Sequence, residues 1–127
     1  PCVPHLRDDG GKIIAIGSGT GQRPSPGVGP YGASKAALSL MLKALASELR
    51  SSNIAVNELI PGPVRTELTG FDPEAGQDVH DGFAKVIEGT GEWLKDPADV
   101  VDLALLIARF PNDGPSGQVF CLNGRLL

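Results

Sequence analysis

The stretch that decides the fold is Lys12-Ile-Ile-Ala-Ile-Gly-Ser18, followed after a glycine- and proline-rich loop by Tyr31-Gly-Ala-Ser-Lys35. The apolar run before Ser18 is typical of a strand that is covered on both faces. Tyr31 and Lys35 stand four residues apart at the start of an alanine- and leucine-rich segment, so they should share one face of a helix. We therefore expect a hydroxyl, a phenol and an ammonium where one strand meets the following helix.

These three side chains carry the groups that proton transfer at a carbonyl or alcohol oxygen requires. A phenol can donate the proton, a nearby cation eases the ionisation of that phenol, and a hydroxyl can hold the substrate. On its own the Tyr31–Lys35 spacing is a weak pattern, because a helix-start tyrosine near a solvated lysine has the same spacing. Its weight comes from the combination with Ser18, the intervening loop, and Pro61-Gly62 at the end of the next predicted strand.

The size and composition of the chain limit the classes of protein it can belong to. The 127 residues are 41% hydrophobic and 20% charged, with a formal net charge of −4, which suits one modest globular domain. The charge and the lack of a run of Lys or Arg disfavour nucleic-acid and anionic-membrane partners, and no apolar stretch approaches transmembrane length. Cys2 and Cys121 lack metal-binding spacing; a bridge between them is conceivable, but a reduced cytoplasmic pair is favoured.

The remaining sequence alternates predicted strands and helices, which favours a parallel sheet with right-handed crossovers. The predicted elements are strands at 12–17, 54–60 and 118–122, a helix at about 31–50, and a helix from the Asp96-Pro97 cap to just before Pro111. The proline-rich loop at 19–30 should contain no helix. The helix at 31–50 is apolar around most of its circumference, so one side should pack on the sheet and the other on a further partner, expected to be another subunit.

The segment Gly17-Ser-Gly19-Thr-Gly21 has some features of a dinucleotide phosphate loop, but three observations oppose that interpretation. The spacing is GxGxG rather than GxGxxG. No helix is expected to open at Gly21, so no helix N-terminus is available for a pyrophosphate. No acidic residue follows about 20 residues later to hold a ribose, since the first acid after Asp9 is Glu48. We therefore reject a nucleotide loop here.

Taken in order along the chain, these motifs resemble the C-terminal half of a short-chain dehydrogenase/reductase of the compact, non-extended branch. The matching stretches are Ile16-Gly-Ser18, Tyr31-Gly-Ala-Ser-Lys-Ala-Ala37, Ile54-Ala-Val-Asn57, Pro61-Gly-Pro-Val-Arg-Thr66, Asp96-Pro-Ala-Asp-Val100 and Gly117-Gln-Val-Phe120. The resemblance implies an α/β chain that forms the C-terminal half of a doubly wound, parallel-sheet Rossmann fold. Residues 1–127 would then be one portion of a dehydrogenase domain, with a catalytic strand–helix unit at 12–50 and a substrate lid at 67–95.

The resemblance also implies roles for individual residues. Tyr31 would be the general acid/base, Ser18 would orient the substrate oxygen, and Lys35 would ease the ionisation of Tyr31 and bind the nicotinamide ribose. The implied cofactor is NAD or NADP, held by Tyr31 and Lys35 and by the segment after the second strand at Pro61, Gly62, Val64 and Thr66. The implied activity is hydride transfer between this cofactor and a small carbonyl or alcohol substrate. The implied assembly is a cytoplasmic dimer or tetramer formed through the helix at 31–50.

The segment at 67–95 contains three aromatic residues, Phe71, Phe83 and Trp93. They are expected either to line a pocket for an apolar substrate or to anchor the segment to the core. Asp78-Val-His80-Asp81 in the same segment is expected to be a solvated helix face, because no second ligand group has the spacing that a metal site needs.

Two alternative functions remain open. The family's N-terminal half, with its glycine-rich phosphate loop, has no counterpart in these residues, and one edge of the sheet would lack its neighbour. A truncated, non-catalytic relative that acts as a binding or assembly subunit would account for this, and these 127 residues alone are expected to be inactive. An isomerase or dehydratase on the same fold is a further possibility, although the YGASK and PGPVRT sequences favour dehydrogenase/reductase chemistry.

Overall fold

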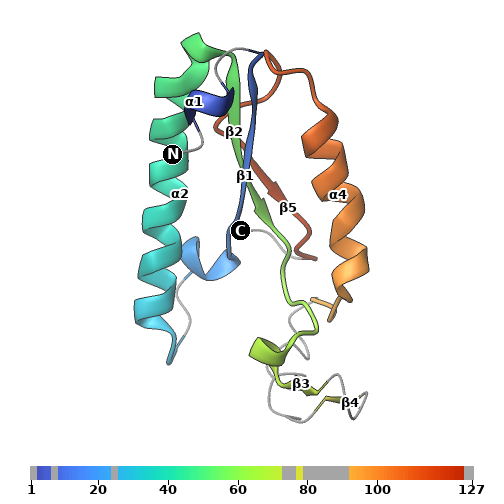
Figure 1. The fold of residues 1–127 in the computed structure, drawn as a ribbon. Coiled ribbons are helices and arrows are strands. Elements are labelled where there is room, and N and C mark those ends of the chain that lie inside the picture. Colours follow the sequence, from blue (N-terminus) through green and yellow to red (C-terminus); the bar gives the residue numbers. More distant parts are fainter. Residues whose placement is uncertain (1–2, 7–8, 24–25, 73–76, 79–91, 125–127) are drawn as a thin grey trace.

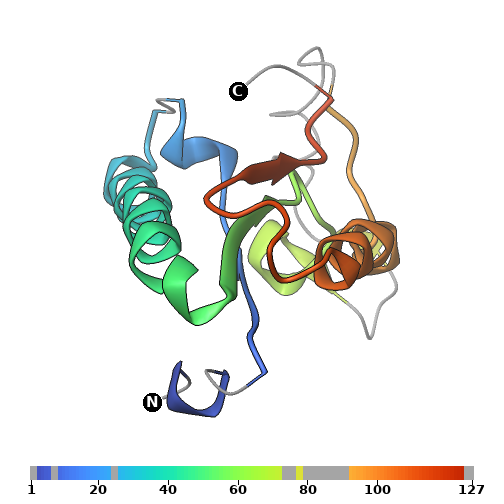
Figure 2. The ribbon, with the colours of Figure 1, turned by 90° about the horizontal axis from the view of Figure 1, so that it is seen from above.

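The structure is a computed structural model that describes residues 3–6, 9–23, 26–72, 77–78 and 92–124. Its main sheet consists of three parallel strands in the order β1 (Gly11–Ile16), β2 (Ile54–Ile60) and β5 (Val119–Cys121). Two long helices, α2 (Gly29–Leu49) and α4 (Pro97–Arg109), lie on opposite sides of this sheet (Figures 1 and 2). The predicted parallel α/β arrangement is confirmed.

Several short elements complete the described part of the chain. They are the helix α1 (Val3–Leu6), the 3₁₀ turns η1 (Gly19–Gly21), η2 (Arg50–Ser52) and η3 (Glu67–Thr69), and the antiparallel pair β3 (Phe71–Asp72) and β4 (Gln77–Asp78). The turn η1 corrects the expectation that the loop at 19–30 contains no helix. It forms because it precedes the first proline of the loop and because Ser18 Oγ accepts a hydrogen bond from the backbone N–H of Thr20. Helix α1 was not predicted; its Val3 and Leu6 pack against the core.

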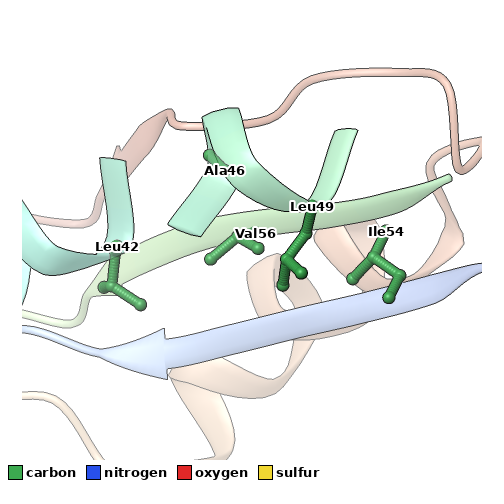
Figure 3. Packing of buried hydrophobic residues seen from close by; sticks show 5 residues of the cluster. All are labelled: Leu42, Ala46, Leu49, Ile54 and Val56. Atoms are coloured by element: carbon green, nitrogen blue, oxygen red, sulfur yellow. The ribbon is translucent and has the colours of Figure 1, made fainter. Parts of the chain in front are cut away.

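Strand β2 is the centre of the sheet, and every residue from Ile54 to Ile60 is buried. Ile54 and Val56 pack against three residues of α2, namely Leu42, Ala46 and Leu49 (Figure 3). Their spacing of four and three residues places them on one face of the helix. The prediction that one side of α2 packs on the sheet is therefore confirmed.

The other long helix, α4, begins as the sequence predicts. Pro97 occupies the first turn, and the backbone N–H of Asp96 donates a hydrogen bond of 2.8 Å to the Asp99 carboxylate. This reciprocal cap satisfies an amide that helix formation would otherwise leave without a partner. The helix ends at Arg109, just before Pro111, which cannot continue a helix.

Candidate active site

The residues predicted to form the site lie at the carboxyl ends of the parallel strands. Strand β1 ends at Ile16, two residues before Ser18, and β2 ends at Ile60, directly before Pro61-Gly62. Because Ile16 lies opposite Leu59 in the parallel register, both strands end at the same edge of the sheet. Figure 1 shows η1 and the start of α2 beside the end of β1. Ligands of open α/β sheets bind at this edge.

The first turns of α2 present Tyr31 and Lys35 to the end of β1. The Lys35 ammonium donates a hydrogen bond of 3.0 Å to the carbonyl oxygen of Ile16. Its nitrogen lies 5.8 Å from the centre of the Tyr31 ring, at the outer limit of a cation–π contact. Tyr31 itself remains 41% exposed, so it is accessible to a substrate. The structure thus brings the phenol and the ammonium together beside the strand end.

Ser18 belongs to a turn that packs closely on the same helix. Its hydroxyl lies 2.9 Å from the Thr20 hydroxyl, which satisfies it within the turn. A Cβ atom at Gly21 would lie 2.8 Å from the backbone nitrogen of Ala36, and one at Gly32 would lie 2.9 Å from the carbonyl oxygen of Thr20. Glycine at these two positions therefore allows η1 to approach α2 closely enough to hold the Ser18 turn against the helix.

The residues predicted to contact the cofactor form one loop that continues β2. Gly62 has a φ of 74°, a left-handed conformation that favours glycine and lets the chain turn sharply after the strand. The carbonyl oxygen of Val64 accepts a hydrogen bond of 2.9 Å from Thr69, and Thr66 is exposed. No hydrogen bond described in the structure joins this loop to Ser18, Tyr31 or Lys35, so the loop flanks these residues without bonding to them.

The three aromatic residues at 67–95 are described to different degrees. Trp93 is half-exposed, and the centre of its ring lies 3.7 Å from the Lys95 nitrogen. This contact places Trp93 next to the loop that follows β2 (Pro61, Gly62, Val64 and Thr66, called the cofactor loop below for its predicted role), because Lys95 pairs with Val64 in a parallel bridge. Only the backbone of Phe71 is described, in β3, and Phe83 lies outside the described residues.

Two buried ionisable residues near this edge were missed by the sequence interpretation. Glu58 interrupts the apolar run of β2, a signal that could have revealed it, and it is only 2% exposed. Lys95 is fully buried but precedes the polar cap of α4, so no sequence signal marks it. Among the described residues, no group of three or more His, Cys, Asp or Glu could hold a metal ion. The expected helix face at 78–81 is wrong for Asp78, which lies in strand β4, and His80 and Asp81 lie outside the described residues.

Replacing Glu58 with methionine is expected to stabilise the protein. Neither carboxyl oxygen of Glu58 has a hydrogen-bond partner in the described structure, and the side chain fills the space that a Cβ at Gly17 would need. An unpartnered buried polar group costs about 1–3 kcal/mol, so we expect Glu58→Met to raise the free energy of unfolding by an amount of this order. Denaturant unfolding of the complete protein measures this free energy. Glu58→Gln is the control, because glutamine keeps a polar side chain of the same size at the buried position. A lower stability for the methionine variant would show that the carboxyl has a stabilising partner.

Comparison with known proteins decides the family. The model of the short chain dehydrogenase family matches residues 2–76, which is more than half of the chain. The chain belongs to the short-chain dehydrogenase family. This agrees with the resemblance based on the sequence motifs.

Individual relatives of this short-chain dehydrogenase chain cover nearly all of it. It is 35% identical over 117 residues to the NADPH-dependent aldehyde reductase-like protein, chloroplastic, of Arabidopsis thaliana, which covers 91% of the chain and 41% of that protein. A 3-oxoacyl-[acyl-carrier protein] reductase with bound NAD from Brucella melitensis has a TM-score of 0.70 at 29% identity, over 97% of this chain and 42% of that one. The structure of ElxO with NADP bound has a TM-score of 0.77 at 25% identity, and the match covers 97% of this chain and 49% of that one.

These structural similarities confirm that the sheet and its helices form part of a Rossmann fold. The short-chain dehydrogenase chain spans less than half the length of each of these relatives. Among the helices that the structure describes, none is long and apolar enough to cross a membrane.

Proposed function

We propose that the protein is an NAD(P)-dependent oxidoreductase that transfers hydride between the nicotinamide cofactor and a carbonyl or alcohol substrate. The observation that carries this proposal is the pairing of Tyr31 with Lys35 at the end of β1, where Lys35 is held by the Ile16 carbonyl oxygen. Ser18 adds a hydroxyl on the adjacent turn. The names of the relatives, an aldehyde reductase-like protein and a 3-oxoacyl reductase, describe chemistry of this kind.

In the proposed reaction, each side chain handles a different part of the proton transfer. During reduction, the Tyr31 hydroxyl gives its proton to the substrate oxygen while hydride reaches the carbonyl carbon, and oxidation reverses both transfers. The positive charge of Lys35 stabilises the phenolate that Tyr31 becomes. The Ser18 hydroxyl exchanges its contact with Thr20 for the substrate oxygen, which orients the reacting bond. Because Tyr31 is exposed, it can be reprotonated from solvent.

The described residues fit a nicotinamide cofactor. Lys35 and Tyr31 offer hydrogen-bond donors beside the strand end, and Val64 and Thr66 follow the sharp turn at Gly62 on the same edge of the sheet. When bound, the nicotinamide supplies or accepts the hydride. We further assign the segment at 67–95 to covering the substrate, because its described ends, η3 and Trp93, both border the cofactor loop.

The direct experiment is an assay of the complete protein with NADH and NADPH against a panel of aldehydes and ketones. We expect binding of at least one cofactor and its oxidation only when a carbonyl substrate is present. Failure of the complete protein to bind either cofactor or to turn over any substrate would contradict the proposal. That result would favour the alternative of a non-catalytic binding or assembly subunit.

We also propose that the protein forms a dimer or tetramer through the outer face of α2. Leu40 is 71% exposed and Met41 lies beside it, whereas the opposite face of the helix packs on the sheet. Leu40→Glu should place a charge in this interface and weaken association by more than about tenfold, the equivalent of 1.4 kcal/mol. Sedimentation of the complete protein measures the shift, with Leu106→Glu as a control, because Leu106 is an exposed leucine on the other long helix, α4. An unchanged assembly in Leu40→Glu would exclude this face as the interface.

We place the proposed enzyme in the cytoplasm. Cys121 carries a free thiol, and its sulfur accepts a hydrogen bond of 3.3 Å from the backbone N–H of Asn123. Reduced cysteines are typical of cytosolic proteins. The net charge of −4 leaves nucleic acids and anionic membrane surfaces outside the proposed partners.

A further inference from the structure

The backbone of Lys95 is hydrogen-bonded to the backbone of the loop that follows β2. The Lys95 N–H donates a hydrogen bond of 3.0 Å to the carbonyl oxygen of Pro63, and the Lys95 carbonyl oxygen accepts one of 2.7 Å from Arg65. Val64 and Lys95 thereby form a parallel bridge. These bonds attach the start of α4 to the loop that holds the proposed cofactor residues.

The side chain of Lys95 extends from this bridge into the protein toward Gly62. Its ammonium stacks on the Trp93 ring and, among the residues that the structure describes, makes one long hydrogen bond, 3.4 Å to the Trp93 carbonyl oxygen. A Cβ atom at Gly62 would lie 3.0 Å from the Lys95 nitrogen and 2.7 Å from Asn123 Oδ1. The Lys95 ammonium, a hydrogen-bond donor, and the Asn123 side-chain oxygen, an acceptor just after β5, therefore both lie next to Gly62.

The burial of the Lys95 ammonium and of the Asn123 side-chain oxygen costs free energy of folding. Asn123 Oδ1 is buried and has no hydrogen-bond partner in the described structure, so it is an acceptor close to a lysine that has hydrogen atoms to donate. A lysine is almost never fully buried unless it is paired, because removing its charge from water is unfavourable. Stacking on the Trp93 ring offsets part of this cost but leaves most of the donor capacity of the ammonium unused among the described residues.

We propose that Lys95, acting together with Asn123, is a positioning residue that fixes the Gly62 turn and so the cofactor loop. In the proposed arrangement the Lys95 nitrogen donates a hydrogen bond to Asn123 Oδ1, which links the loop to the end of β5 across Gly62. Val64 and Thr66 follow this turn directly, so any displacement of Gly62 displaces them. This inference rests on the proposed function, since the loop matters only if it holds a cofactor.

The test compares Lys95→Met with the unaltered complete protein. Methionine keeps the apolar stem of the side chain and removes the charged nitrogen. We expect the Kd and KM for the nicotinamide cofactor to rise roughly tenfold, a change of about 1.4 kcal/mol, with kcat changed less than about twofold and the midpoint of thermal unfolding unchanged or higher. Arg109→Met, at the exposed last turn of α4, is the matched control for removing a cation and should change these quantities little.

A double-mutant cycle tests the partnership with Asn123. Asn123→Ala should raise the Kd by a similar factor, and the double variant should be no worse than either single variant, because coupled residues are not additive. If the losses of cofactor affinity in the two single variants add up in the double variant, Lys95 and Asn123 do not act together.

The pH dependence of stability supplies a second measurement. Burial lowers the pKa of Lys95 below its ordinary value of 10.5, and the charges of Glu92, Cys121 and Asp99 oppose this only in part. Below pH 10.5 the unfolded lysine binds a proton before the folded one does, so stability should fall as the pH decreases from about 10.5 toward the lowered pKa. Lys95→Met should remove this slope.

The outcomes separate the inference from the function on which it rests. An unchanged cofactor Kd in Lys95→Met, with the unaltered protein binding normally, would overturn the inference alone. A large loss of thermal stability in that variant would also overturn it, by showing that Lys95 supports folding rather than the loop. If the unaltered protein binds no nicotinamide cofactor, both the proposed function and the inference fail.

Discussion

Replacing Tyr31 by phenylalanine in the complete protein is expected to lower kcat by about 10²- to 10⁴-fold, the range for loss of a general acid/base. The substitution removes only the hydroxyl that would exchange a proton with the substrate. Because the ring remains at the start of α2, the Lys35 contact should be nearly unchanged, and the cofactor should lose only the hydrogen bond that the Tyr31 hydroxyl offers it. The loss should therefore be much larger in kcat than in cofactor affinity.

A control for this experiment lies on the same helical turn. The Ser34 hydroxyl donates a hydrogen bond of 2.7 Å to the Tyr31 carbonyl oxygen, so Ser34→Ala removes a neighbouring hydroxyl without touching the proposed chemistry. It should retain near-normal steady-state kinetics. Steady-state rates with the best substrate from the carbonyl panel provide the comparison. Full turnover by Tyr31→Phe would mean that another group transfers the proton.

Leu42→Ala is expected to destabilise the protein by roughly 2–5 kcal/mol, the range for large-to-small substitutions in a packed core. Leu42 is 4% exposed and packs with Ala46, Ile54 and Val56 between α2 and the sheet (Figure 3). The substitution leaves a cavity where the helix meets β2, and this contact also holds the Tyr31–Lys35 end of α2 over β1. Denaturant unfolding of the complete protein measures the loss.

The matched control is Leu106→Ala on α4. Leu106 is 52% exposed, so the same change in chemistry there removes little buried surface and should cost well under 1 kcal/mol, as is usual for surface sites. Equal losses at the two positions would show that the interface between α2 and β2 is not the core that the structure describes.

The parts of the fold that could be predicted are those with strong local signals. The run from Ile54 to Ile60, apolar except at Asn57 and Glu58, indicates β2, and the Asp96-Pro97 cap marks the start of α4. Helix α1 and the turn η1 could not be predicted, because each is too short to show a period. They are stabilised by packing on the core and by the Ser18–Thr20 hydrogen bonds.

The candidate site also has features that local sequence spacing predicts and features that depend on tertiary packing. The helical spacing of Tyr31 and Lys35 is enough to place both on one face. The hydrogen bond from Lys35 to Ile16 depends on how α2 packs beside β1, which no local pattern specifies. Lys95 was missed because burial of an ionisable residue is a tertiary property, set by elements far away in the sequence. Glu58 did carry a local signal, the polar interruption of β2, which the sequence interpretation did not use. Sequence motifs therefore identify the chemical groups of the site, whereas packing determines what surrounds them.

The central claim is that this edge of the sheet supports proton transfer coupled to hydride transfer. The most direct measurement follows deuterium from reduced nicotinamide cofactor that is dideuterated at C4 to the product carbon that was the carbonyl carbon of the substrate, using the complete protein and its Tyr31→Phe variant in a single turnover. We predict that the unaltered protein places deuterium on that carbon and that the variant does so far more slowly. Product without deuterium, or equal rates for the two proteins, would contradict the claim.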